Sequence, residues 1–472
     1  MSNIAQSEED IGGKIMLIDK TKDFDYKDLD FDEIDEGFTF KEAVREAKRC
    51  LNCPKPLCRA GCPIENEIPE FIKALAGGNI GEASGVIARR SNLPAVCGRV
   101  CPHEKQCEGA CILSKKGQGI KIGKLERFIA DVDAELEISS VKKQSHIKGK
   151  VGVIGSGPAG LTVAGDLAKL GFSVTVFESQ SEPGGVLMYG IPEFRLSKEV
   201  VRREIHSIER LGVIFQTNTL VGQEVTIDDM FSQGYDAIFI GTGTALPKAL
   251  KIPGHDLPGV IQATYFLQIV MLANSGKVDP IEVPVHAGEQ VVVIGAGNVA
   301  MDAARTALRL GAANVTVVYR RREQEITALK SEFEIAREEG VQFKWLRSPM
   351  QCIGTSKLTG LECEVQKITE DGTSMSTGEK EILAADKLIL AIGQRPASRI
   401  VSTTTGINVS PAGFVITKER PYGMTTRHGV FAGGDVVHEP ATVVLAMKEA
   451  KKVAAGIAQY VEAKKLMDEC GL

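Results

Sequence analysis

The chain has 472 residues, of which 43% are hydrophobic, 25% are charged and 49 are glycine, and this composition is typical of a globular protein with several domains and many tight turns. The formal net charge of −5 and the scattered basic residues argue against a nucleic-acid or anionic-membrane binder. The acidic start MSNIAQSEEDIGG lacks the order of a signal peptide and no apolar run reaches the length of a bilayer span, so we expect a cytoplasmic protein without a membrane span.

The N-terminal third of the chain consists of an acidic segment followed by a cysteine-rich one. Residues 1–40 are acidic and lack apolar periodicity, which predicts an extended arm. Residues 41–145 contain helix-like stretches such as FKEAVREAKR and little strand pattern. Eight of the eleven cysteines lie between Cys50 and Cys111. In a reducing compartment such a cluster indicates metal ligation rather than disulfides, so residues 41–145 are predicted to be a helical metal-binding domain.

The cysteine spacing favours iron–sulfur clusters over zinc. The two sets are Cys50-x2-Cys53-x4-Cys58-x3-Cys62-Pro and Cys97-x3-Cys101-Pro-x4-Cys107-x3-Cys111. In two-cluster ferredoxins three close cysteines hold one cluster, and the next cysteine, before a proline, belongs to the other. Structural zinc sites favour pairs of CxxC knuckles, and only the first two cysteines have that form. Eight thiolates would suit two all-cysteine [4Fe–4S] clusters by number alone.

From Lys150 onward the sequence alternates short β-branched runs with Ala- and Leu-rich runs, which predicts parallel βαβ units. The stretch VGVIGSGPAGLTVAGDLAKLGFSVTVFE, which begins at Val151, is repeated as VVVIGAGNVAMDAARTALRLGAANVTVVYR from Val291, and each copy has a closing strand, at 235–243 and 385–393. The predicted fold is therefore α/β, with two Rossmann-like domains after the helical domain. The second domain, residues 286–393, is inserted into the first, residues 146–285 and 394–472.

The first glycine motif predicts a dinucleotide site. In GSGPAG, Gly155 makes the turn, Gly157 lets the backbone approach a pyrophosphate, and Gly160 permits close packing of helix on strand. Pro158 suits the first helical turn, whose free N–H groups and dipole favour phosphate. Glu178 ends the second strand, where an acid would receive ribose hydroxyls.

The second motif differs where nucleotide choice is decided. It reads Gly295-x-Gly297-Asn298-x-Ala300, and the position that matches the acid of the first copy is Tyr319, followed by Arg320, Arg321 and Arg322. Guanidinium groups bind a 2′-phosphate through charge-assisted hydrogen bonds, so this domain is predicted to take NADP(H). The alternative is that the arginines only solvate a helix start.

Further segments carry a family resemblance. GSGPAG, FES, EPGGVLMYGIP, IGTG, AIGQRP and FAGGDVV resemble flavoproteins with two dinucleotide-binding domains, and together with the cysteine sets they resemble one group of these. That group comprises the glutamate synthase small subunit, the FAD- and NADPH-binding half of dihydropyrimidine dehydrogenase, and the large subunit of electron-bifurcating NADH-dependent ferredoxin:NADP oxidoreductase. The resemblance implies that the first domain binds FAD, with Arg195 near the flavin. Together, the first glycine motif and the resemblance predict FAD binding by Gly155, Gly157, Pro158, Ala159, Gly160, Glu178, Gly185, Gly241, Gly243, Gly434 and Asp435. The second glycine motif and the arginines after it predict NADPH binding by Gly295, Gly297, Asn298, Ala300, Arg320 and Arg321.

The resemblance also implies the cluster ligands. It assigns Cys50, Cys53, Cys58 and Cys111 to the first [4Fe–4S] cluster, and Cys62, Cys101, Cys107 and Glu126 to the second. Glu126 is implied because the fourth ligand in this group is a Glu or Gln in a motif similar to GKLERF. Cys97 is then not a ligand, whereas counting thiolates would make it one.

The expected function is electron transfer among NADPH, FAD and two [4Fe–4S] clusters. Disulfide reductases need a redox-active pair such as CxxC beside the flavin, and no such pair occurs in the FAD domain. The segments CEGAC, IGKLERF and IPEFIK look closest to the bifurcating ferredoxin:NADP oxidoreductase subunit; the alternatives are the small subunit of glutamate synthase and a non-catalytic scaffold. Since the chain has no further redox or amidotransferase domain, we expect a second redox subunit, and ferredoxin, as partners.

Overall fold

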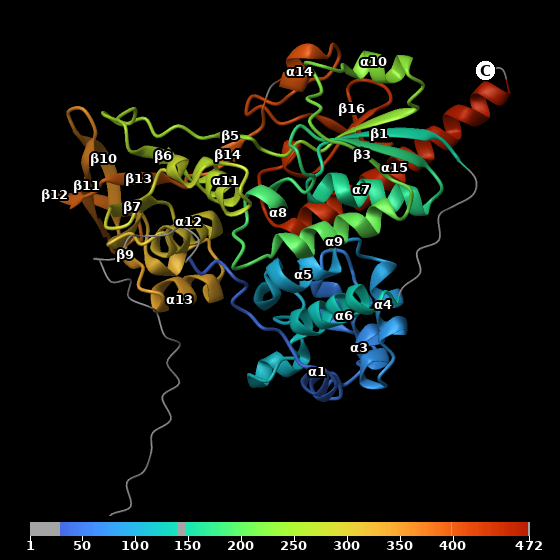
Figure 1. The fold of residues 1–472 in the computed structure, drawn as a ribbon, viewed down its shortest axis with the longest axis horizontal. Helices are drawn as coiled ribbons and strands as arrows, with labels where there is room; N and C mark the ends of the chain where they lie inside the picture. Colours follow the sequence, from blue (N-terminus) through green and yellow to red (C-terminus); the bar gives the residue numbers. More distant parts are fainter. Residues whose placement is uncertain (1–28, 139–146, 398, 471–472) are drawn as a thin grey trace, which may run out of the picture. The chain divides into compact units, whose positions relative to one another are not determined.

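The computed structural model describes residues 29–138, 147–397 and 399–470. Residues 1–28 of the predicted arm therefore lie outside the described residues. The chain divides into two compact units (Figure 1). The larger unit consists of Phe31–Ala249 and Ile392–Leu472, and the smaller unit includes Leu250–Ala391.

The N-terminal part of the larger unit is helical, as the sequence predicts. Its segments are α1 (Phe40–Ala47), α2 (Leu57–Gly61), α3 (Ile68–Ala76), α4 (Ile80–Ala88), α5 (Pro94–Val100), the 3-10 turns η2 (His103–Lys105) and η3 (Ile112–Lys116), and α6 (Ile122–Leu136). Helix α1 begins at a capping box, in which the Thr39 hydroxyl accepts from the Glu42 N–H and the Glu42 carboxylate accepts from the Thr39 N–H at 2.9 Å. Phe71, Leu75, Leu125 and Ile129 are fully buried between these helices.

The rest of the larger unit is built on a seven-stranded sheet. The strand order is β15 (Thr417–Glu419), β16 (Tyr422–Thr425), β17 (Val430–Ala432), β4 (Ala237–Ile240), β1 (Lys150–Ile154), β2 (Ser173–Phe177) and β3 (Ile214–Gln216). Strands β17, β4, β1, β2 and β3 are parallel, and β16 and β15 continue the sheet in antiparallel pairs. The central strands β1 and β4 are almost entirely buried, as expected for a parallel sheet covered by helices on both faces.

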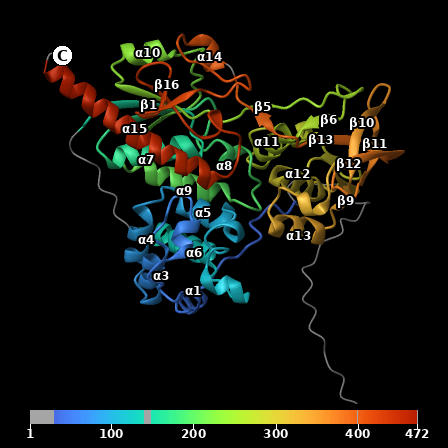
Figure 2. The same cartoon turned by 180° about the vertical axis from the view of Figure 1, so that it is seen from behind.

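The helices of this part connect or cover the strands. They are α7 (Pro158–Lys169), α8 (Val186–Tyr189), α9 (Lys198–Glu209), α10 (Ile227–Ser232), α14 (Arg399–Thr403), the 3-10 turn η6 (Gly434–Val436) and α15 (Val443–Glu469). Helix α7 packs against α15, and α9 packs against α5 of the helical part, as both views show (Figures 1 and 2). The cysteine-bearing helices are thus packed directly on the sheet-containing part of the same unit.

The smaller unit contains the second copy of the repeat. Its parallel sheet has the order β6 (Val260–Gln262), β13 (Lys387–Leu390), β7 (Gln290–Ile294), β8 (Asn314–Tyr319) and β9 (Gln342–Trp345). Its helical segments are α11 (Ala263–Asn274), η4 (Pro280–Glu282), α12 (Asn298–Arg309), η5 (Glu323–Glu325) and α13 (Lys330–Glu338). An antiparallel sheet of β10 (Arg347–Gly354), β11 (Leu358–Ile368) and β12 (Ser374–Ala384) lies between β9 and β13 in the chain.

The chain leaves the larger unit and returns to it at one place. Strand β5 (Leu246–Pro247) pairs antiparallel with β14 (Gln394–Arg395), and the smaller unit is the sequence between them. The predicted fold class, two Rossmann-like parts with one inserted in the other after a helical domain, is confirmed. The smaller unit includes β6 and α11, which precede residue 286, because β6 hydrogen-bonds to β13. None of the described helices is long and apolar enough to cross a membrane.

Candidate redox centres and nucleotide sites

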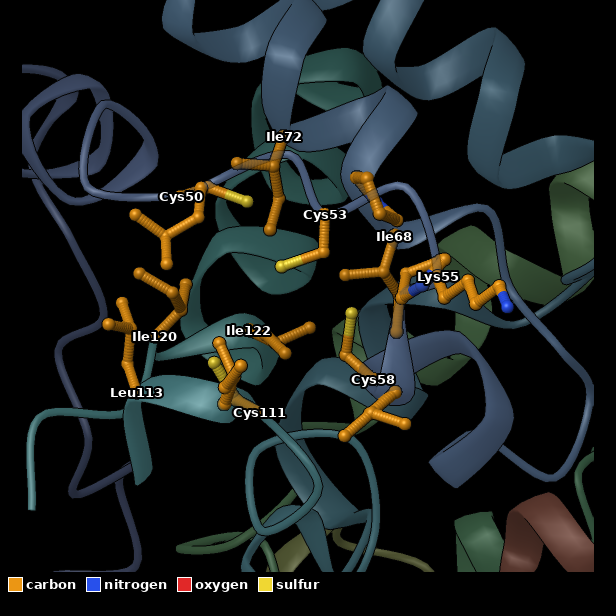
Figure 3. Close-up of a pocket in the computed structure, with 15 residues that line it drawn as sticks. Cys50, Cys53, Lys55, Cys58, Ile68, Ile72, Cys111, Leu113, Ile120 and Ile122 are labelled. Carbon is orange, nitrogen blue, oxygen red and sulfur yellow. The ribbon is translucent and has the colours of Figure 1, made fainter. Parts of the chain in front are cut away.

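Four cysteines from separate segments surround one cavity in the helical part. Cys50 and Cys53 lie in the loop after α1, Cys58 lies in α2, and Cys111 directly precedes η3. Their sulfur atoms point into a common space of about 210 Å³ (Figure 3). The remaining wall is mainly aliphatic, from Ile68, Ile72, Leu113, Ile120 and Ile122. These are the four cysteines that the resemblance assigns to one cluster, although Cys111 is far from the others in the sequence.

The first cavity suits a metal–sulfur cluster chemically. Burial raises the pKa of the Cys58 thiol to about 11 and also raises the pKa of Cys50, so these thiolates need a nearby positive charge to form at neutral pH. Ferric and ferrous ions supply that charge, and thiolates are their preferred ligands in iron–sulfur proteins. Among the described residues, no three His, Cys, Asp or Glu side chains are close enough to share a single metal ion; the cysteines are spread around a space instead.

A second, smaller cavity lies beside the first in the helical part. Cys62, Cys101, Cys107 and Glu126 all line it. Burial raises the pKa of the Cys62 thiol to about 12 and that of the Glu126 carboxyl to about 8. Glu126, on α6, is 7% exposed and accepts a hydrogen bond from Asn66 Nδ2 at 3.1 Å through one oxygen. Its other oxygen has no hydrogen bond to a described residue.

Cys97 also lines the second cavity, so the structure brings the two rival candidates for the fourth ligand to one place. Its thiol is buried and lies 3.6 Å from the Met447 sulfur. The exclusion of Cys97 from the ligand set remains a prediction.

His103 also lines the second cavity, and the sequence predicts no role for it. Its Nε2 atom is buried and has no hydrogen-bond partner among the described residues, and its ring lies against Gly123, where a Cβ would come within 2.4 Å of it. Burial lowers the pKa of His103 to about 4. The sequence feature that could have indicated that His103 lies at this cavity is its position directly after Cys101-Pro102.

The first glycine motif has the backbone geometry that a phosphate loop requires. Gly155 has a φ of +92°, and a Cβ there would lie 2.8 Å from the Gly241 carbonyl oxygen. A Cβ at Gly160 would lie 1.9 Å from the Gly155 oxygen, so helix α7 starts in direct contact with the loop. Gly157 is the N-cap of α7, and a Cβ added to it would have no atom within 4 Å; Pro158 occupies the first helical position. The free N–H groups at this helix end therefore face accessible space.

Glu178 lies beside this loop, at the end of β2, and is buried. Its Oε2 accepts hydrogen bonds from Ser156 N at 3.0 Å and from Ser156 Oγ at 2.5 Å, and its Oε1 accepts from Gln180 N at 2.8 Å. The Ser156 hydroxyl in turn accepts from Gly184 N at 2.9 Å. Glu178 thus connects the glycine loop to the EPGG segment.

The other predicted FAD-binding residues converge on the same helix end. Gly185 has a φ of +54°, and a Cβ there would lie 2.8 Å from the Gly157 Cα. Gly434 has a φ of +74°, and its Cβ would lie 2.9 Å from the Ala159 Cβ. The neighbouring Asp435 has its pKa raised by burial, and Gly243 has a φ of +62° with open space around it. Segments from three parts of the chain therefore meet at the N-terminus of α7.

Arg195 belongs to a tight turn that begins at Pro192, whose carbonyl accepts from the Arg195 N–H at 3.1 Å. The buried Lys198 holds this turn, because its ammonium group donates to the carbonyls of Leu187 and Leu196, each at 3.0 Å. The structure therefore fixes the turn to the segment after Gly185, and the role of Arg195 remains a prediction.

The second glycine motif repeats this geometry in the smaller unit. Gly295 has a φ of +125°, and a Cβ there would lie 2.4 Å from the Ala391 oxygen. Ala300 is fully buried on α12, which Gly297 caps. The Asn298 amide oxygen accepts from Leu329 N at 2.9 Å, which ties the loop after β8 to the start of α12.

The three arginines after β8 differ in their contacts. Arg322 pairs with Glu325 at 2.9 Å. Arg320 and Arg321 are exposed, and neither side chain forms a hydrogen bond or ion pair with a described residue. These two guanidinium groups are therefore available to an anionic ligand.

Comparisons with known proteins agree with this arrangement. Residues 27–138 match the family described as dihydropyrimidine dehydrogenase domain II, 4Fe-4S cluster, and residues 149–450 match the pyridine nucleotide-disulphide oxidoreductase family. The glutamate synthase [NADPH] small chain of Escherichia coli is 36% identical over 450 residues, which cover 92% of this chain and 94% of that protein. Subunit PreT of the NAD-dependent dihydropyrimidine dehydrogenase of Escherichia coli is 34% identical over 431 residues, covering 91% and 97%.

Solved structures show the same fold. FprA of Mycobacterium tuberculosis in complex with NADPH superposes with a TM-score of 0.56 at 21% identity, over 68% of this chain and 86% of that one. Thioredoxin reductase of Lactococcus lactis gives a TM-score of 0.50 at 24% identity, over 66% and 99%. Together with the cysteine cavities and the two glycine motifs, these relationships show that the chain belongs to the pyridine nucleotide-disulphide oxidoreductase family and is an iron–sulfur flavoprotein oxidoreductase of the glutamate synthase small-chain and dihydropyrimidine dehydrogenase group.

Proposed function

We propose that this chain is the NADPH-oxidising small subunit of a glutamate synthase-like complex, which passes electrons to a partner subunit through two [4Fe–4S] clusters. The observation that carries the proposal is that two cysteine-lined cavities and the glycine loop with its converging segments belong to one compact unit. The similarity to glutamate synthase small chains along 92% of this chain supports the same role.

When bound, FAD would take up a hydride from NADPH, and the clusters would carry its electrons singly. The residues of the larger unit would hold FAD by its diphosphate, at the N-terminus of α7 next to Gly157, where Gly185 and Gly434 let two neighbouring segments pack closely against this helix end. In the smaller unit the N-terminus of α12 would receive the NADPH diphosphate, and Arg320 and Arg321 would bind its 2′-phosphate.

The first cavity has the features of an exit point for electrons. Leu51, Leu57 and Ile112 line it and are 60%, 51% and 48% exposed, respectively, so a partner protein could approach a cluster held there closely. The second cavity is lined by buried residues such as Cys107 and Glu126. A cluster held in the first cavity would therefore be the one placed to supply electrons to the partner, and a cluster held in the second cavity would be enclosed by protein.

Two other functions compete with this proposal. The sequence favoured the subunit of an electron-bifurcating ferredoxin:NADP oxidoreductase, whereas the relatives reported above favour the glutamate synthase alternative. A scaffold that binds flavin without oxidising NADPH is a third possibility. The bifurcating role stays a prediction that depends on the partner subunit and on ferredoxin.

The test uses anaerobically purified chain, alone and with a glutamate synthase large chain. NADPH should bleach the flavin absorption of the chain alone within the mixing time of a rapid-scan experiment, and the large chain should then support NADPH-dependent glutamate formation. If the flavin did not bleach, the chain would not oxidise NADPH, and the scaffold function would be favoured. Bleaching without glutamate formation, but with NADPH-linked reduction of ferredoxin in the presence of a flavoprotein partner, would favour the bifurcating subunit.

A further inference from the structure

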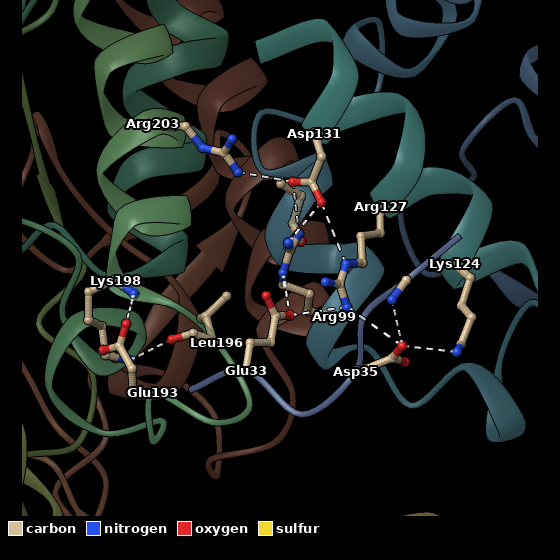
Figure 4. A network of polar contacts seen from close by, with 12 residues as sticks. Glu33, Asp35, Arg99, Lys124, Arg127, Asp131, Glu193, Leu196, Lys198 and Arg203 are labelled. Carbon is tan, nitrogen blue, oxygen red and sulfur yellow. Dashed lines mark hydrogen bonds and ion pairs between the residues drawn. The ribbon is translucent and has the colours of Figure 1, made fainter. Parts of the chain in front are cut away.

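A short acidic segment at the start of the larger unit lies across the helices that carry the second cavity. This segment, residues 31–37, is named here the acidic strap. It is anchored by Phe31, which is 8% exposed, and it presents the carboxylates of Glu33 and Asp35 to α5 and α6 (Figure 4). The sequence predicts an extended arm here and does not identify these contacts.

Glu33 forms ion pairs with two arginines whose side chains are almost fully enclosed by protein. Its Oε1 accepts from Arg99 Nε at 2.7 Å and lies 3.1 Å from an Arg127 Nη1 atom. The Arg99 and Arg127 side chains are only 4% and 10% exposed, and that of Glu33 is 17% exposed. Charges this well enclosed interact more strongly than a surface pair, and removal of one partner leaves the others uncompensated.

Asp131, one helical turn after Arg127, completes the network. It accepts from Arg99 Nη1 and Nη2 at 3.1 and 2.8 Å, lies 3.5 Å from Arg127 Nε, and accepts from Arg203 of α9 at 3.0 Å. Asp35 adds a more distant contact with Arg127, at 3.8 Å. Figure 4 shows these side chains directed toward one another from the strap, α5, α6 and α9.

The network joins the two helices that carry lining residues of the second cavity. Arg99, on α5, lies between Cys97 and Cys101 in the sequence, and Arg127 directly follows Glu126 on α6. The two helices touch through their backbones at this point, because a Cβ at Gly98 would lie 2.6 Å from the Arg127 N atom. The position of Glu33 relative to the two arginines therefore helps to fix the two halves of the second cavity against each other.

The strap also contacts the turn that contains Arg195. The Ile34 N–H donates to the Phe194 carbonyl at 3.2 Å, and the Phe194 side chain is 2% exposed. One short segment thus contacts both the helices of the second cavity and the turn that is expected beside the flavin.

We propose that Glu33 is a positioning residue for the second cluster, which sets the geometry of its site and its reduction potential through Arg99 and Arg127. This inference rests on the second cluster of the proposed function. With Glu33 neutral, the two guanidinium groups would keep only Asp131 and the distant Asp35 as counter-charges. The extra positive charge would favour the reduced cluster, which carries one more electron, so its potential would rise.

The test compares Glu33→Gln with Glu36→Gln, which removes the same charge from an exposed position in the same segment. Redox titrations with mediators are followed by EPR, and the second cluster is identified as the signal that Cys62→Ala removes. In Glu33→Gln the ratio of reduced to oxidised second cluster at a given potential should rise about tenfold, which corresponds to about 59 mV for one electron. The EPR line shape of the second cluster should also change in Glu33→Gln, whereas the first cluster should be unaffected. Glu33→Asp, which keeps the carboxylate, should show most of the wild-type behaviour.

Results other than those expected would contradict the proposal, as follows. A second-cluster potential and line shape in Glu33→Gln that equal those of Glu36→Gln would overturn the role of Glu33 while leaving the two-cluster assignment intact. Wild-type protein with one cluster signal would overturn the assignment itself, and the role of Glu33 with it. If Glu33→Gln does not fold, Arg127→Lys keeps the charge but loses the guanidinium contacts, and it should alter the line shape with little change in potential; an unchanged line shape would refute the positioning role.

Discussion

Replacement of both Arg320 and Arg321 by alanine should weaken NADPH binding about a hundredfold and leave NADH binding nearly unchanged. A hydrogen bond to a charged group contributes about 1.5–3 kcal/mol. Because both side chains are exposed after β8, solvent and salt screen them, and the lower end of that range applies. About 1.4 kcal/mol corresponds to a factor of ten in the dissociation constant, so each arginine accounts for about one factor of ten.

Arg322 provides the matched control. It is the neighbouring arginine, but its guanidinium is already paired with Glu325, so Arg322→Ala should change NADPH affinity by less than about threefold. Dissociation constants are measured for the oxidised nucleotides NADP⁺ and NAD⁺, which carry the same difference at the 2′ position and do not reduce the flavin, by isothermal titration calorimetry on FAD-loaded protein at two salt concentrations, and the loss of NADP⁺ affinity should shrink at high salt. Equal losses for both nucleotides in the double variant, or a loss in Arg322→Ala as large as in Arg320→Ala, would refute recognition of the 2′-phosphate by these two residues.

Three further expectations concern the cofactors and the pH dependence. Anaerobically purified protein should contain about one FAD and about eight iron atoms per chain, and zinc with little iron would contradict the cluster assignment. Cys97→Ala should retain both clusters whereas Glu126→Ala should lose or convert the second; EPR and iron analysis measure this, and the opposite pair of results would show that Cys97 is the ligand. Burial raises the pKa of Glu204, on α9, to about 8, above its value of about 4.3 in the unfolded chain. The folded protein therefore binds more protons between these values, and its stability should fall as the pH rises from about 5 to 8; Glu204→Gln should reduce that fall in urea unfolding experiments at both pH values, and an unchanged fall would contradict the assignment.

Local features of the fold were predictable because their physical causes are local in sequence. A glycine with positive φ after a buried strand, such as Gly155 or Gly295, produces the same turn wherever it occurs, and the repeat made the insertion visible. The order of the strands was less accessible. Strand β6 joins the smaller unit through its pairing with β13, more than a hundred residues later in the chain, and no periodicity within β6 encodes that partner.

The cysteine sites, too, were predictable from the sequence only where their causes are local. Spacing grouped Cys50, Cys53 and Cys58, but only the family resemblance brought in Cys111, since it reaches the same cavity only through the tertiary packing of the helical part. The contacts of Glu33 were invisible to sequence reasoning, because an acidic run lacks the apolar periodicity that indicates burial, and its burial arises from two arginines on distant helices. His103 was not predicted, because the buried ring nitrogen that lacks a hydrogen-bond partner among the described residues is evident only in three dimensions.

The insertion of the smaller unit has a consequence for synthesis of the chain. Strand β4 lies between β1 and β17 in the large sheet, yet residues 430–432 of β17 are synthesised only after the whole smaller unit. Until then the outer edge of β4 offers unpaired N–H and C=O groups on an apolar strand, which is the kind of edge that recruits other chains. During translation, the nascent protein is therefore most prone to aggregate in the interval when the smaller unit is emerging from the ribosome, and a chaperone that covers this edge would act in that interval.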